Sequence, residues 1–106
     1  MNRAGGLAVK DERLIARDDV HYRARGFGPD AQPLSLLIVN ISALGLMARC
    51  DTAFDTGDRL RVILPVVGVI AIEVRWSLGG RIGCQLDQPI ALSDYYELLA
   101  TMLKSR

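Results

Sequence analysis

The chain has 106 residues, of which 50% are hydrophobic and 24% are charged, the size and composition of one globular domain. Its formal net charge of +1 excludes a global positive field that would attract nucleic acid or anionic lipid, so an anion site would have to be local. The longest apolar stretch is interrupted by Pro65 and Gly68, and the N-terminus has no secretory hydrophobic region. We therefore expect a cytoplasmic protein without membrane insertion.

Residues 1–12 contain Gly5, Gly6 and a cluster of charges without periodicity, which predicts a flexible N-terminal arm before a domain over residues 13–106. Short apolar or alternating runs then predict strands at residues 21–25, 34–40, 44–50, 59–64, 69–76 and 81–86. Short turns join most of these strands. We therefore expect an all-β fold whose antiparallel sheet closes into a barrel, over about residues 19–87, or into a tight sandwich.

The run over residues 69–76 also predicts the direction of its larger side chains. Alternation places Arg75 beside Glu73 on one face, and Trp76 with Ile72 and Val74 on the other face. Arg75 and Arg81, which flank a predicted hairpin, can each pair with Glu73. We expect Trp76 to pack in the core or at the barrel rim, with stacking on a nucleotide base as the alternative.

A helix is expected after the last strand. Apolar residues recur at spacings of three and four between Leu92 and Leu103, which predicts an amphipathic helix over about residues 93–104. Ser93 is the expected N-cap, and Asp94 lies favourably in the first turn. The apolar stripe of this helix would pack on the sheet or on a partner protein.

The cysteines and the histidine argue against a metal site and against catalysis. Cys50 and Cys84 form no CxxC pair, and with His21 as the only histidine there are too few soft ligands for zinc. We expect two buried or half-buried free thiols, with a single disulfide as the alternative, and no cofactor. Ser42 has no histidine nearby in the sequence and no GxSxG elbow, and the chain has no P-loop. We do not expect an enzyme.

Two features remain as candidates for binding. Arg13 and Arg17 are four residues apart and can reach one ligand from the same side of a coil, and arginine suits phosphate groups and guanine edges. Asn40, Ser42 and Gly45 lie in a turn between two predicted strands, where polar groups can be presented from a rigid platform. The alternatives are surface ion pairs for the arginines and local turn bonding, with Gly45 at positive φ, for the turn.

Together these residues resemble the PilZ domain family, bacterial receptors for cyclic di-GMP. The family pattern is RxxxR in an N-terminal arm followed by [D/N]xSxxG, matched here by Arg13 and Arg17 and then by Asn40, Ser42 and Gly45. Residues 74–76 and 80–86 are also similar to the last two strands of the family. The resemblance implies a six-stranded antiparallel β-barrel with a C-terminal helix.

The resemblance also implies roles for these residues. Arg13 and Arg17 would grip guanine edges and phosphates, Asn40 would hydrogen-bond a guanine, and Ser42 would contact guanine or phosphate. Gly45 would permit the turn and the close approach of the ligand. Arg23, Arg25 and Trp76 are secondary candidates.

One position departs from the family pattern. Many relatives have another arginine directly before the first motif arginine, where this chain has Glu12. That position bears on whether one ligand or an intercalated pair is bound. The resemblance therefore implies a single ligand or a lower affinity here.

The expected function is that of a cyclic di-GMP receptor, monomeric or homodimeric, which relays the second messenger to an unknown effector protein in trans. Ligand binding would order the arm that carries Arg13 and Arg17 and so change a surface read by the partner. The alternative is a nucleotide-independent adaptor that acts through protein contacts. A nucleic-acid-binding barrel is disfavoured by the balanced charge and the few aromatic residues.

Overall fold

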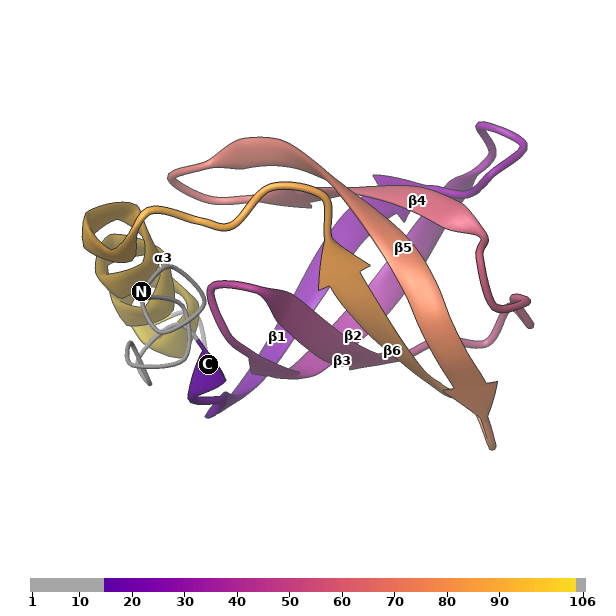
Figure 1. The fold of residues 1–106 in the computed structure, drawn as a ribbon, viewed down its shortest axis with the longest axis horizontal. Helices are drawn as coiled ribbons and strands as arrows, with labels where there is room; N and C mark the ends of the chain where they lie inside the picture. The colour runs from indigo at the N-terminus through magenta and orange to yellow at the C-terminus, as the bar shows by residue number, and fades with distance from the viewer. Residues whose placement is uncertain (1–14, 105–106) are drawn as a thin grey trace, which may run out of the picture.

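The computed structural model describes residues 15–104, so the predicted arm over 1–12, Glu12 and the candidate Arg13 lie outside the described residues. The described part of the chain forms the strands β1 (Asp18–Phe27), β2 (Pro33–Ile41), β3 (Gly45–Arg49), β4 (Arg59–Leu64), β5 (Gly68–Leu78) and β6 (Arg81–Leu86), followed by the helix α3 (Leu92–Lys104). The strands close into a barrel in the order β1-β2-β3-β6-β5-β4, and all neighbours are antiparallel (Figure 1). The predicted all-β barrel with a C-terminal helix is confirmed.

Alternating side chains explain how the barrel closes. In β4 the inward residues Leu60, Val62 and Leu64 are buried and the intervening residues are exposed. Burying an aliphatic side chain of this size contributes about 1.5–3 kcal/mol relative to leaving it exposed. Inward residues of the other strands extend this apolar core. Because the core fixes the position of the strands, polar side chains on the outer face project from a rigid backbone.

Two β-bulges change the direction of side chains that concern the site. The register shifts between Ile38 and Asn40 in β2, and again between Val74 and Trp76 in β5. An extra residue in one strand reverses the alternation beyond it. Asn40 and Trp76 therefore leave the inward face that strict alternation assigns them, and Trp76 is 40% exposed. The prediction that Trp76 shares the face of Val74 is wrong.

The bulges bring residues of four strands into one row on the outer face. Asn40 pairs with Met47 of β3, Met47 pairs with Gly83 of β6, and Gly83 pairs with Trp76 of β5. The amide Nδ2 of Asn40 lies 3.7 Å from Sδ of Met47, in agreement with this order. A second row beside it contains Gly45, Gln85, Glu73 and Arg59.

The helix α3 lies across the left end of the barrel in Figure 1 and buries Tyr95, Leu98 and Met102. It begins at Leu92, and the N–H of Tyr95 donates to the carbonyl of Ala91. Ala91 therefore holds the N-cap position, two residues earlier than the predicted Ser93. None of the helices within residues 15–104 is long and apolar enough to cross a membrane.

Both cysteines are free and buried, as predicted. Burial, followed by the neighbouring Cys50 thiol, raises the pKa of Cys84 to about 12. The Cys84 thiol is therefore protonated at neutral pH.

Candidate functional site

A pocket of about 340 Å³ lies on the outer face of the barrel beside the β2–β3 turn. Three residues predicted for the site, Arg17, Ser42 and Gly45, line this pocket, and so does Trp76. Asn40 adjoins them through Arg17. The structure therefore brings together the described candidates of the RxxxR and [D/N]xSxxG patterns and adds a wall from β5 and β6.

Arg17 is held at the entrance to β1 by Asn40. Its Nη1 donates to Oδ1 of Asn40 at 2.8 Å, so the two motifs meet although they lie in different parts of the chain. The resemblance implied that Asn40 hydrogen-bonds a guanine. Here its amide oxygen already accepts from Arg17, so Asn40 orients the guanidinium while leaving its charge intact.

Ser42 organises the β2–β3 turn from inside it. Its Oγ accepts from the N–H of Leu44 at 3.2 Å and of Gly45 at 3.1 Å, and donates to the carbonyl of Gly45 at 3.4 Å. These bonds use both acceptor positions and the single proton of the hydroxyl. The side chain is 3% exposed. Its contribution in this structure is a rigid turn, and a direct contact with a ligand stays a prediction.

Gly45 is required by the close approach of two strands. Its φ is not positive, so the alternative interpretation, in which Gly45 adopts a left-handed conformation in the turn, is wrong. A Cβ on Gly45 would lie 2.6 Å from the carbonyl oxygen of Cys84 in the neighbouring β6. The bare backbone also keeps the floor of the pocket open beside Gln85, its partner in the register.

Trp76 lies against Gly83, and this pair was not found from the sequence. A Cβ on Gly83 would overlap the indole atoms of Trp76, so the ring covers the strand where no side chain stands. Because this ring lines the pocket, it offers an aromatic surface to a planar ligand. The signal in the sequence was the glycine inside an otherwise apolar strand.

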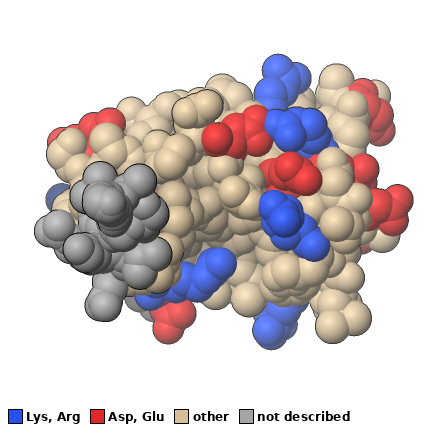
Figure 2. Space-filling model, viewed as in Figure 1, with Lys and Arg blue, Asp and Glu red and all other residues tan. Residues whose placement is uncertain are grey.

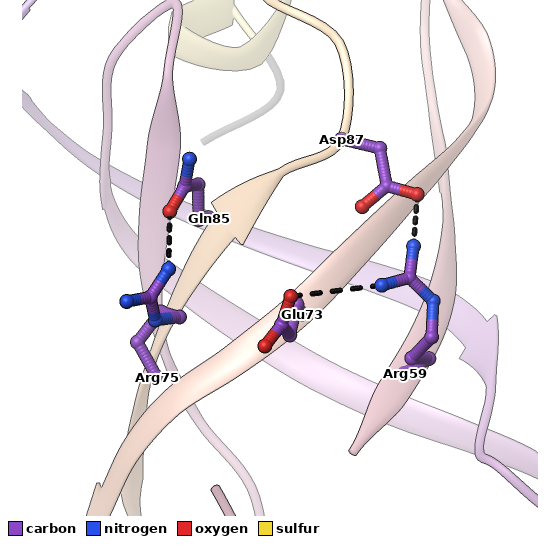
Figure 3. Close-up of polar contacts among 5 residues, drawn as sticks. All are labelled: Arg59, Glu73, Arg75, Gln85 and Asp87. Carbon is purple, nitrogen blue, oxygen red and sulfur yellow. Dashed lines mark hydrogen bonds and ion pairs between the residues drawn. The ribbon is translucent and has the colours of Figure 1, made fainter. Parts of the chain in front are cut away.

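Arg75 also lines the pocket, and its partner differs from the predicted Glu73. Its Nη1 donates to Oε1 of Gln85 at 2.6 Å, whereas Glu73 lies 3.6 Å from Nη1 of Arg59 (Figure 3). Arg59 also contacts the carboxylate of Asp87. The predicted pairing of Arg75 with Glu73 is wrong, because the bulge before Trp76 turns Arg75 toward β6.

Other candidates lie apart from this pocket. Arg23 and Arg25 are exposed on β1, opposite Leu37 and Ser35 of β2, and neither lines the pocket. Arg25 instead lines another depression with Ile63. Figure 2 shows acidic and basic side chains side by side on the face in view, so charges of both signs are interspersed there.

The helix α3 contacts the residues next to Arg17 and Asn40 through Tyr95. The single hydroxyl proton of Tyr95 is shared between two acceptors, Oδ2 of Asp18 at 2.6 Å and the carbonyl oxygen of Ile41 at 2.9 Å. Burial, and then the hydrogen bond to Asp18, raise the pKa of Tyr95 above its ordinary value. Asp18 directly follows Arg17, and Ile41 lies between Asn40 and Ser42. One buried hydroxyl therefore links the helix to both halves of the site.

Comparison with known proteins identifies the fold. No family model matches the chain, and no curated protein matches it. Among solved structures, it is similar to the PilZ domain of YcgR from Escherichia coli, which was solved with c-di-GMP. The two share 14% identity with a TM-score of 0.58, over 85% of this chain and 89% of that one. The protein therefore has a PilZ-like fold.

Proposed function

We propose that this domain is a non-catalytic receptor for cyclic di-GMP that binds at the pocket beside the β2–β3 turn. The observation that carries the proposal is the bond between Arg17 and Asn40 at the rim of this pocket. It joins β2, beside the turn, to a guanidinium that forms no ion pair with a carboxylate among residues 15–104. The likeness in fold to a PilZ domain solved with c-di-GMP supports the same ligand.

The chemistry of the lining suits this ligand class. A guanidinium offers paired donors to a phosphate or to the O6/N7 edge of guanine, and an indole ring offers a stacking surface. Arg17 and Trp76 supply these two groups from different sides of the pocket. Arg13, which belongs to the same RxxxR pattern, is proposed to add a second guanidinium from the N-terminal side.

The relay to a partner is proposed to run through α3. A ligand that draws Arg17 inward also moves the adjoining Asp18, and Asp18 is bonded to Tyr95. The helix presents Tyr96 and Leu103 to solvent, at 48% and 39% exposure, where a protein partner can read a change of position. The signal is then delivered in trans from a cytoplasmic domain.

Calorimetric titration with cyclic di-GMP tests the proposal. The wild-type chain is expected to bind at micromolar or lower concentrations, while GTP at the same concentration binds more weakly. Absence of heat at tens of micromolar would contradict the receptor function. It would favour the alternative of a nucleotide-independent adaptor with the same fold.

A further inference from the structure

Arg75 occupies a fixed position on the wall of the pocket. It lies at the β5 bulge, and Nη1 of its guanidinium donates to Oε1 of Gln85 at 2.6 Å. Its backbone carbonyl accepts from Oγ1 of Thr56 at 3.5 Å. Gln85 stands opposite Gly45 in the register, so no side chain of β3 separates this pair from the pocket.

The partner of Arg75 leaves its charge available. The amide oxygen of Gln85 carries no net charge, so the hydrogen bond orients the guanidinium and does not neutralise it. Within residues 15–104, the nearby carboxylates of Glu73 and Asp87 pair with Arg59 instead (Figure 3). The guanidinium of Arg75 therefore presents a full positive charge at the pocket wall, and its hydrogen-bond partner is the uncharged amide of Gln85.

The position of Arg75 complements that of Arg17. Asn40 holds Arg17 from β2 and Arg75 extends from β5, with β3 and β6 between them. Three strand spacings correspond to about 14 Å along the sheet, a separation that two extended arginine side chains bridge toward one ligand. This arrangement fits a ligand with two phosphate groups better than a ligand with one.

We infer that Arg75, oriented by Gln85, is a second phosphate-binding residue of this pocket and acts together with Arg17 on a dianionic cyclic dinucleotide. The inference rests on the proposed function, because it assigns a further contact at the same site. Gln85 is a positioning residue in this arrangement. Its neutral side chain maintains the charge that the ligand meets.

The test is titration of the full chain with cyclic di-GMP at several NaCl concentrations. Arg75→Gln is expected to raise Kd about ten- to hundredfold, the loss of one charge-assisted hydrogen bond, and to make the salt dependence shallower. Arg81→Gln is the matched control. It removes the same charge from an exposed position of β6 that does not line the pocket, and it is expected to change Kd less than about twofold.

A second variant tests the inference without altering the arginine. Gln85→Glu retains a hydrogen-bond acceptor for Arg75 but adds a carboxylate, so the charge at the wall is cancelled and Kd is expected to rise about tenfold. Thermal unfolding of each variant, followed by circular dichroism, verifies that the barrel is intact. These substitutions are at exposed positions, and unchanged unfolding temperatures are expected.

The outcomes separate the two levels of the proposal. If the wild type binds cyclic di-GMP and Arg75→Gln behaves like Arg81→Gln, the role of Arg75 is refuted while the receptor function stands. If the wild type does not bind, both are refuted. Equal Kd values for Gln85→Glu and wild type would also overturn the inference, because the charge at the wall would then be irrelevant to the ligand.

Discussion

The outer face of the barrel has two regions in which arginine is held in opposite ways. On the pocket side, Arg17 and Arg75 bind the side-chain amides of Asn40 and Gln85. On the β4 side, Arg59 pairs with the carboxylates of Glu73 and Asp87. The same residue type therefore serves as an available cation in one region and as a compensated ion pair in the other. What decides the difference is the charge of the partner.

The largest expected effect that tests this comparison is on ligand binding. Arg17→Ala should lose a charge-assisted contact worth about 1.5–3 kcal/mol, whereas Arg59→Ala should leave the affinity for cyclic di-GMP nearly unchanged. Calorimetry on both variants measures the contrast. Comparable losses in the two variants would remove the distinction between the regions.

The backbone beneath the pocket gives the next effect. Gly45→Ala places a Cβ against the carbonyl oxygen of Cys84, so β3 or β6 must shift, and we expect a loss of about 1–3 kcal/mol in the free energy of unfolding. Chemical denaturation measures it. Ala71→Gly, on β5 outside this contact, is a control for a general change in strand stability and should cost about 0.5–1 kcal/mol. If Gly45→Ala is as stable as the wild type, β3 and β6 are not packed as closely at Gly45 as this structure shows.

The third prediction concerns the hydrogen bonds of Tyr95, which connect α3 to the pocket side of the barrel. Tyr95→Phe removes the hydroxyl from Asp18 and Ile41, and the buried carbonyl of Ile41 loses this donor, so we expect about 1–2 kcal/mol lower stability. Thermal unfolding measures this loss. Titration should also show a changed affinity for cyclic di-GMP if Asp18 transmits the position of Arg17. Tyr96→Phe, at an exposed neighbouring ring, should change neither quantity.

The smallest effect concerns the thiol behind the pocket. The pKa of Cys84 rises from an ordinary 9.0 to about 12, so the folded chain holds this proton more tightly than the unfolded chain. The resulting stability is present below pH 9.0 and is lost as the pH rises toward 12. At pH 8, iodoacetamide should modify Cys84 much more slowly in native protein than in urea, as measured by mass spectrometry. Rapid modification of the native protein would mean that the Cys84 thiol is accessible to solvent rather than buried.

Much of this architecture follows from local sequence signals. Alternating apolar residues predict the strands, and β4 has the predicted bounds. The spacing of apolar residues predicts α3 to within one residue of its start. The RxxxR and [D/N]xSxxG patterns predict that Arg17 and Asn40 belong to one site, and the two side chains are in contact. The role of Arg13 stays a prediction, since it lies outside the described residues.

Other features depend on register, which is a property of strand pairs. The bulges in β2 and β5 place Asn40 and Trp76 on the outer face, although strict alternation assigns them to the inner one. The same register gives Gln85 to Arg75 and Glu73 to Arg59. Periodicity within one strand contains no information about an extra residue relative to its neighbour.

The sequence by itself determined the strands, the helix and the residue types of the binding turn, because burial and turn chemistry act over a few neighbouring residues. Closure into a barrel rather than a sandwich was decided by the pairing of β1 with β4. The tertiary structure decided which arginines bind neutral amides and which pair with carboxylates. It also decided where the indole of Trp76 lies and how Tyr95 reaches Asp18. These contacts join residues far apart in the chain, and their geometry is set only when the strands have closed around the core.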